Sequence, residues 1–309
     1  MLEAAKKIAK VARNAILFKT VPLQEHVKFL GVGDLHFNKQ DNRGKAIAAA
    51  AGVTQRQVTK FWRLAVQQFS PTIILDVGAN YGEIALSSRY LRGSEVHLFE
   101  ANPALIPFLH RSIASHANAD AVKLHAKLVS DSMGTKTFYV DEKWSGTSSA
   151  IGRIHDDAGF KGAGAESFKD LDVESVTIDS LFNSRTLSND RLLFKIDVEG
   201  FEEKVLLGMS STLSSVESFV GIMEFDKKYL VRAGSDPVKV FEWLKSIATV
   251  KVLTKAGVAP IQDEISDHAD LIISSPKIAA SGWLAASIVP FNQRVWLGLS
   301  LDKPDRSMR

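Results

Sequence analysis

The chain has 309 residues, of which 45% are hydrophobic and 24% are charged, and its formal net charge at pH 7 is +3. This composition is typical of a soluble globular protein, and the weak positive charge does not favour a nucleic-acid binder, which carries a concentrated basic face. The absence of cysteine excludes disulfide frameworks, thiolate metal sites and cysteine nucleophiles.

Residues 1–70 are predicted to form a helical N-terminal extension. Residues 1–19 place apolar side chains on one helical face and carry five basic residues against the single acid Glu3. We expect this helix to pack on the rest of the protein, with attachment to an anionic membrane surface as the alternative, because its apolar face is largely alanine. A second helix is predicted over residues 46–69, which end at a Ser-Pro pair.

Residues 71–275 show short apolar runs alternating with amphipathic segments. Alternation of this kind predicts a mostly parallel sheet covered on both faces, which is a doubly wound α/β domain. The predicted strands are residues 73–77, 95–99, 122–129, 192–196, 219–224, 250–254 and 271–274, and the predicted helices are residues 83–91, 103–116, 202–208 and 237–247.

A Gly- and Ser-rich insert, residues 141–171, lies between two short predicted strands at residues 136–140 and 175–178. Its composition predicts a surface loop. Trp144 and the hydroxyl residues after it would suit a sugar or polyol, although a solvated turn with one packed tryptophan explains them equally well. Residues 276–309 are expected to form a C-terminal extension. The histidines lack metal-ligand spacing, so no metal site is predicted.

The strongest local signal is the turn DVGANYG at residues 76–82, which directly follows an apolar strand. Glycines let backbone approach a ligand closely, and cofactors of open α/β sheets bind beyond the carboxyl ends of the strands. Dinucleotide turns have the pattern G-x-G-x-x-G, whereas an acid here precedes only two glycines. That acid would repel a pyrophosphate but not the cationic groups of S-adenosylmethionine. The predicted contacts to this cofactor are Asp76, Gly78, Asn80, Gly82, Glu100 and Asn102, with Glu100 on the ribose.

Two later strands are predicted to end in charged residues. Lys195, Asp197 and Glu199 alternate after one apolar run, which places them on one side if the strand stays extended, and Glu224 ends the next run. Charges at such positions are costly to bury unless they are paired or bind a ligand. We predict Asp197 as the first candidate for a general base, Glu224 as the second, and Lys195 as the group that orients them. A structural Lys195–Asp197 ion pair and a capping role for Glu224 are the alternatives.

These segments together resemble the FkbM family of methyltransferases over about residues 72–274. The resemblance implies a class I methyltransferase fold, S-adenosylmethionine as donor, and O-methylation of a hydroxyl on a sugar, glycan or secondary metabolite. The matching runs are DVGANYG (76–82), EANP (100–103), VTIDSL (176–181), KIDVEGFE (195–202), VLLGM (205–209) and Met223-Glu224.

Two other interpretations remain open from sequence: an NAD-dependent oxidoreductase, and a binding protein that keeps the fold without activity. The glycine spacing argues against the first, and the charged strand ends argue against the second. The expected partner is a small-molecule or glycan acceptor and not a nucleic acid. Because charges interrupt the N-terminal apolar stretch, no signal peptide is predicted and a cytoplasmic location is expected.

Overall fold

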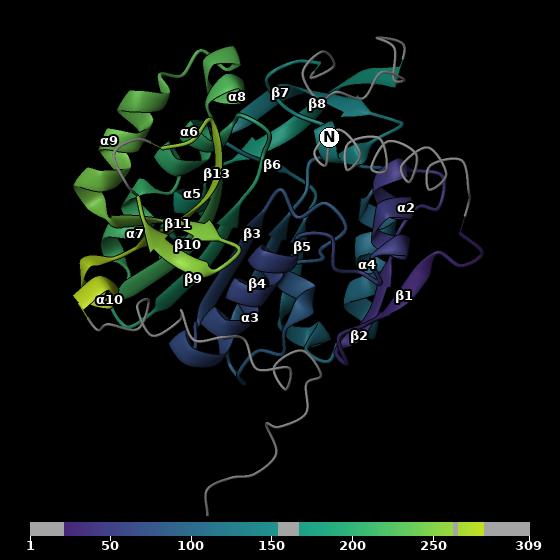
Figure 1. Cartoon of the computed structure of the whole chain (residues 1–309), viewed down its shortest axis with the longest axis horizontal. Helices are drawn as coiled ribbons and strands as arrows, with labels where there is room; N and C mark the ends of the chain where they lie inside the picture. The colour runs from purple at the N-terminus through teal and green to yellow at the C-terminus, as the bar shows by residue number, and fades with distance from the viewer. Residues whose placement is uncertain (1–21, 154–166, 262–264, 281–309) are drawn as a thin grey trace, which may run out of the picture.

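The computed structural model describes residues 22–153, 167–261 and 265–280. Its central sheet contains β3 (Ile73–Val77), β4 (Glu95–Phe99), β5 (Val122–His125), β9 (Arg191–Ile196), β10 (Ser218–Asp226), β11 (Thr249–Thr254), β12 (Gly257–Pro260) and β13 (His268–Ser274). The strand order is β12-β11-β13-β10-β9-β3-β4-β5 (Figure 1). Neighbours from β10 to β5 pair in parallel, whereas β13 runs antiparallel to both β10 and β11. The prediction of a doubly wound, mostly parallel α/β fold, as expected for the class I methyltransferase fold, is therefore confirmed.

Different helices cover the two faces of this sheet. They are α3 (Arg56–Phe69), α4 (Ile106–Ser115), α5 (Ile178–Phe182), α6 (Glu202–Leu207), α7 (Ser210–Ser215), α8 (Lys227–Arg232) and α9 (Pro237–Ile247). Successive strand residues point to opposite faces. Leu75 accordingly packs in a core cluster with side chains of α5 to α9, whereas Ile74 packs in a second cluster with α3 and α4. Two buried layers thus hold the central strands in register.

The predicted strands 73–77 and 95–99 and the predicted helix 237–247 agree with the structure residue for residue. Their boundaries carry clear local signals. At the start of α9, Asp236 accepts hydrogen bonds from the backbone N–H groups of Val238 and Lys239, and Pro237 occupies the first turn. Among the described residues, none of the helices has the length and apolar character needed to cross a bilayer.

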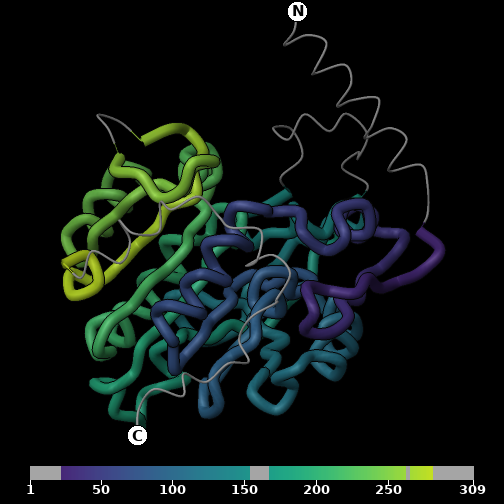
Figure 2. Tube along the Cα trace, turned by 60° about the horizontal axis from the view of Figure 1, so that its bottom comes forward, coloured from purple at the N-terminus to yellow at the C-terminus, as the bar shows by residue number. Residues whose placement is uncertain are grey.

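The N-terminal extension contains a β-hairpin that the sequence did not predict. Strands β1 (His26–Phe29) and β2 (Gly33–His36) pair antiparallel, and α2 (Asn42–Ala49) follows them. Figure 2 shows this hairpin, in purple, on the side of the molecule away from the yellow C-terminal strands. Strands of four residues are too short to display a convincing alternation. The helix predicted for residues 1–19 lies outside the described residues.

The prediction of one helix over residues 46–69 was wrong, because α2 ends at Ala49 and α3 begins at Arg56. Gly52 explains the break: its backbone has φ +89°, and a Cβ at this position would meet the Phe29 ring at 2.4 Å. The helix predicted at residues 83–91 was also wrong, since only a short 3-10 turn, Ala85–Ser87, forms there.

The strand predicted over residues 122–129 is divided in two. Its second part, β6 (Leu128–Val129), leaves the central sheet and joins β8 (Phe168–Val176) and β7 (Gly134–Asp141) in a separate three-stranded sheet. The insert predicted as a loop over residues 141–171 is correspondingly shorter, because its ends belong to β7 and β8. Ser149, after the end of β7, forms a β-bridge with Tyr139 of that strand, so the part of the insert that carries Trp144 is anchored.

Candidate active site

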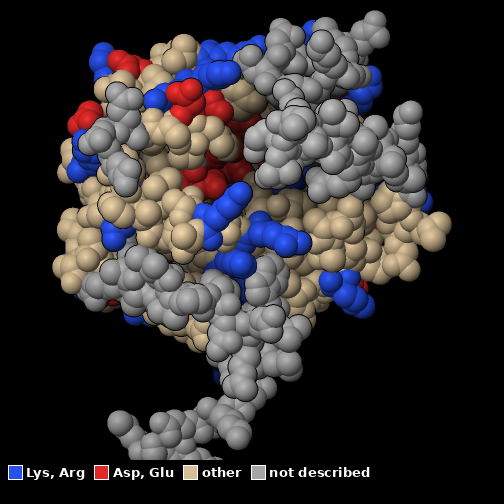
Figure 3. All heavy atoms as spheres, in the orientation of Figure 1, with Lys and Arg blue, Asp and Glu red and all other residues tan. Residues whose placement is uncertain are grey.

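A cavity opens beyond the carboxyl ends of β3, β4, β9 and β10, at the point where the strand order reverses. This is the position where ligands of open α/β sheets bind. Figure 3 shows acidic side chains gathered in a hollow on this face of the molecule. Of the nine predicted site residues, five line the cavity: Gly78, Asn80, Glu100, Asp197 and Glu224. The other four, Asp76, Gly82, Asn102 and Lys195, are buried behind its wall.

The glycine turn after β3 has a backbone that most residues would not tolerate. Gly78 has φ +75°, and a Cβ there would lie 2.0 Å from the carbonyl oxygen of Asp197. Asn80 also has a left-handed backbone, with φ +51°, although it is not glycine. Its N–H donates a hydrogen bond of 2.7 Å to the carboxylate of Glu100. The turn therefore brings β3 into direct contact with the ends of both neighbouring strands.

Glu100 is held by backbone donors on both carboxylate oxygens. Oε2 accepts from Asn80 N–H and Oε1 accepts from Asn102 N–H, each at 2.7 Å. Burial raises the pKa of Glu100 to about 7, and these two hydrogen bonds only partly oppose it. Each oxygen keeps a second lone pair for a ligand hydroxyl. The side chain of Asn102 serves the turn instead, because its Oδ1 accepts from Ala104 N–H at 3.0 Å.

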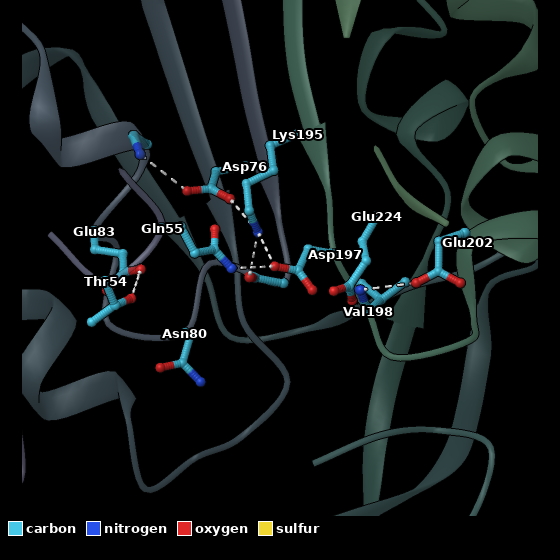
Figure 4. A network of polar contacts seen from close by, with 12 residues as sticks. Thr54, Gln55, Asp76, Asn80, Glu83, Lys195, Asp197, Val198, Glu202 and Glu224 are labelled. Atoms are coloured by element: carbon cyan, nitrogen blue, oxygen red, sulfur yellow. Dashed lines mark hydrogen bonds and ion pairs between the residues drawn. The ribbon is translucent and has the colours of Figure 1, made fainter. Parts of the chain in front are cut away.

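Lys195 lies between two carboxylates at the base of the cavity (Figure 4). Its Nζ is 3.1 Å from Oδ2 of Asp197 and 3.6 Å from Oδ1 of Asp76, and its side chain is only 6% exposed. Burial opposes the charge, but Asp197 and Asp76 raise the pKa of Lys195 above its ordinary value. The Lys195–Asp197 ion pair considered from sequence is therefore present. It places the ammonium where it orients Asp197 without lining the cavity.

Three carboxylates meet at the ends of β9 and β10. Oxygens of Asp197, Glu199 and Glu224 all lie within 4.8 Å of one another. Despite burial, the nearby Lys195 and hydrogen bonds that include one from Gln55 hold the pKa of Asp197 at about 2. Burial and repulsion from Asp197 raise the pKa values of Glu199 and Glu224 well above the ordinary range. The cluster therefore holds one firmly ionised acid beside two that retain protons more readily.

The alternation expected at residues 195, 197 and 199 is only partly present. β9 ends at Ile196, and Glu199 has a left-handed backbone with φ +54°, so an extended strand does not carry all three side chains. Folding still brings Asp197 and Glu199 together. Their spacing with Glu224 would allow the three carboxylates to ligate a divalent cation, which the positions of the histidines in the sequence did not indicate.

Two cavity residues come from the N-terminal extension and were not predicted. Gln55 donates from Nε2 to Oδ2 of Asp197 at 3.2 Å. Arg43 is held by Glu83 at 2.8 Å, and Thr54 donates to the same carboxylate oxygen at 2.5 Å. Gln55 precedes α3 but makes no side-chain capping bond, which leaves its amide for the site. No local pattern in the sequence marks either residue.

A comparison with protein-family models gives one match. The sequence matches the model of the methyltransferase FkbM domain over residues 76–248, more than half of the chain. No curated protein matches it.

Similar solved structures include the methyltransferase FkbM from Methylobacillus flagellatus KT, with 13% identity, TM-score 0.42 and coverage of 86% of this chain and 60% of that chain. An O-methyltransferase from Bacillus cereus in complex with SAH has 13% identity, TM-score 0.42 and coverage of 75% and 87%. The O-methyltransferase TomG from Streptomyces achromogenes, in complex with SAM, has 9% identity, TM-score 0.42 and coverage of 75% and 86%. On the family match, the chain belongs to the FkbM-domain family of methyltransferases.

Proposed function

We propose that this methyltransferase uses S-adenosylmethionine to methylate a hydroxyl group on a sugar, glycan or secondary metabolite. The observation that carries the proposal is that one cavity joins the glycine turn after β3 to the carboxylates after β9 and β10. A donor and an acceptor bound at these two places would meet inside the same cavity. Holding two reactants in a fixed orientation supplies a large part of the rate of a transfer reaction.

The cofactor half fits S-adenosylmethionine on two features. Gly78 packs directly against the Asp197 carbonyl and lines the cavity without a side chain, and the buried carboxylate of Glu100 has free lone pairs for ribose hydroxyls. We assign Gly78, Asn80 and Glu100 to direct cofactor contact. Asp76, Gly82 and Asn102 would support the turn from behind. When bound, S-adenosylmethionine supplies a methyl group made electrophilic by its sulfonium.

The acceptor half contains two carboxylates with different properties. Asp197, with a pKa of about 2, stays ionised and would orient the acceptor hydroxyl by accepting its hydrogen bond. Glu224, whose pKa is raised, is the stronger proton acceptor of the two when it is ionised, and in that form it would take the hydroxyl proton as the new oxygen–carbon bond forms and the sulfur–carbon bond breaks. Lys195 would hold Asp197 in position through their 3.1 Å contact. The methyl group and the proton are thus both accounted for.

The first test is calorimetry with S-adenosylmethionine and S-adenosylhomocysteine on the wild-type chain and on Gly78→Val. Binding by the wild type and none by the variant is expected, because the variant fills space occupied by the Asp197 backbone. NADH serves as the control ligand and should not bind. Equal binding of S-adenosylhomocysteine by both proteins would show that the glycine turn is not part of the cofactor site.

The second test measures transfer of labelled methyl groups to a panel of glycans, hydroxylated metabolites and amines. Transfer to a hydroxyl compound supports the proposal, whereas transfer only to amines would contradict O-methylation. Cofactor binding without any transfer across the panel would favour the binding protein that keeps the fold but not the activity. Repeating the active reactions with EDTA and with added Mg²⁺ tests whether the Asp197, Glu199 and Glu224 cluster uses a cation.

A further inference from the structure

Asp41, which lies outside the stretch matched by the family, accepts four hydrogen bonds on one buried carboxylate. The donors are Tyr81 Oη at 2.8 Å, Ser145 Oγ at 2.6 Å, Ser145 N–H at 3.1 Å and Arg43 N–H at 3.0 Å. Asp41 is only 4% exposed. A buried carboxylate is costly unless donors surround it, so this arrangement is a built feature of the fold.

The donors belong to three segments that are far apart in sequence. Tyr81 is in the glycine turn, Ser145 is in the insert and lines the cavity, and Arg43 is at the start of α2. Two backbone contacts reinforce the junction: Tyr81 Oη accepts from Asn38 N–H at 3.3 Å, and Asn42 N–H donates to the Lys143 carbonyl at 3.0 Å. Asp41 thus joins the N-terminal extension, the cofactor turn and the wall formed by the insert.

One further bond connects this junction to the proposed cofactor contacts. Asn80 Nδ2 donates to Ser145 Oγ at 3.4 Å, while Asn80 N–H donates to Glu100. Asn80 has a left-handed backbone, which costs energy and persists only where the surroundings hold it. Ser145 and Glu100 hold Asn80 from two sides, and Asp41 in turn holds Ser145.

We propose that Asp41 is a positioning residue that couples occupancy of the S-adenosylmethionine site to the placement of the insert wall at Ser145. The inference rests on the proposed function for its ligand. Cofactor contact at Asn80 would stabilise the turn, and the bonds through Ser145 and Tyr81 would transmit that stabilisation to residues 141–149. The N-terminal extension would then form part of the active site and not only a cover for it.

The chemistry requires a carboxylate at this position. Burial and the neighbouring Asp41 charge raise the pKa of Tyr81, so its hydroxyl keeps its proton and acts as a donor. All four groups that face Asp41 therefore donate. Asparagine has nearly the same shape but offers one neutral oxygen and two N–H donors, so in Asp41→Asn at least two of the four donors lose their charged acceptor.

The decisive experiment titrates S-adenosylhomocysteine into the wild type, Asp41→Asn and a matched control, Asp179→Asn. Asp179 also accepts three hydrogen bonds, from Ser211 N–H, Thr212 N–H and Thr212 Oγ1, but it lies in α5 and does not line the cavity. We expect about tenfold weaker binding by Asp41→Asn, the effect of losing one hydrogen bond to a charged group, and wild-type affinity for the control.

Hydrogen exchange provides a readout that a purely structural role would not change. S-adenosylhomocysteine should slow exchange in residues 141–149 of the wild type and of Asp179→Asn, but not of Asp41→Asn. If Asp41→Asn does not fold, Ser145→Ala removes the same bridge more gently and should weaken binding several-fold. Affinity within twofold of the wild type in a folded variant would overturn the inference about Asp41 but not the proposed function. A wild type that does not bind the ligand would overturn the proposed function as well.

Discussion

The carboxyl ends of β3 and β9 lie side by side in the sheet, yet the acidic side chains at the two ends differ in their partners. At the end of β3, the buried Asp76 faces Lys195, and the nearby Glu100 has a backbone donor on each oxygen. At the end of β9, Asp197 shares its space with Glu199 and Glu224, with Lys195 as the cation beside them. At the first end, Asp76 has the ammonium and Ala85 N–H as partners and Glu100 has two backbone donors, whereas three acids crowd the second end.

This difference suggests that the first end serves mainly to bind the cofactor and the second end mainly to react. The turn after β3 has its hydrogen bonds in place and is suited to a ligand of fixed geometry. The crowded acids after β9 and β10 retain repulsion that a proton, a cation or a donor hydroxyl would relieve, and such perturbed carboxylates concentrate at functional sites. We therefore expect changes at the first end to affect cofactor affinity and changes at the second end to affect turnover.

Lys195 belongs to both ends, so Lys195→Met should have the largest effect. Removing the ammonium leaves two buried carboxylates without their cation, and breaking a buried pair in this way costs about 3–5 kcal/mol. The free energy of unfolding from urea titration at pH 7 measures the loss. Lys204→Met is the control, because its 2.8 Å pair with Asp131 is partly exposed and should contribute less than about 1 kcal/mol. Equal losses in the two variants would show that the buried ion pair contributes no more to the free energy of unfolding than the exposed one.

Asp197→Asn should separate the two ends most clearly. We expect turnover to fall about 10²-fold, as for misplacement of the acceptor hydroxyl that Asp197 would orient, while S-adenosylhomocysteine affinity changes little. Initial rates with an acceptor from the panel provide the measurement. Asp226→Asn, at the end of β10, is the control, since that carboxylate caps α8 and should affect stability alone. Normal turnover by Asp197→Asn would show that Asp197 does not orient the acceptor hydroxyl.

Glu100→Ala should weaken cofactor binding by about 1–3 kcal/mol, the range for losing hydrogen bonds to a charged group. Glu95→Ala is the matched control, because Glu95 begins the same strand but pairs with Lys123 and Arg185 near the surface. Calorimetry with S-adenosylmethionine compares the two variants. If both bind as the wild type does, the ribose contact must lie elsewhere.

Stability and cofactor affinity should show opposite pH trends. Burial raises the pKa of Glu100 and of Glu202 to about 7 from an ordinary value of 4.5, so the folded state binds more protons than the unfolded state between these values. The free energy of unfolding of the ligand-free protein should therefore fall as pH rises from about 4.5 to 7. Affinity for S-adenosylhomocysteine should instead rise through pH 7, by at most about tenfold per unit, because the ionised Glu100 accepts the ribose hydroxyls.

Glu100→Gln removes one of the two titrating groups without changing the shape of the side chain. It should flatten the rise in affinity with pH and reduce the fall in stability. Melting temperatures and calorimetric titrations at pH 6, 7 and 8 provide both measurements. A wild-type affinity that does not change over this interval would mean that Glu100 is already ionised or does not contact the ligand.

Sequence alone predicted the elements whose signals are local and strong. The apolar runs of β3 and β4 and the capped start of α9 gave correct boundaries. Glu100, Asp197 and Glu224 were identified because a charged residue at the end of a buried strand is costly to bury unless it is paired or binds a ligand. Gln55 and Asp41 could not be found in this way, because their partners lie 142 and 104 residues along the chain. Only the folded arrangement brings such residues together.

The packing of α3 shows that the stretch matched by the family is shorter than the part of the chain that packs together as one folded domain. The stretch shared with the family begins at residue 76, but Trp62 and Phe61 of α3 are buried in the same core cluster as Ile74 and Leu193 of the central sheet. The same stretch ends before β11 and β13, which complete that sheet. A graft of residues 76–248 into another scaffold would carry the recognisable motifs and leave a face of the sheet uncovered. An exchange of specificity between relatives would have to move the segment from Asp41 to Phe69 together with those motifs.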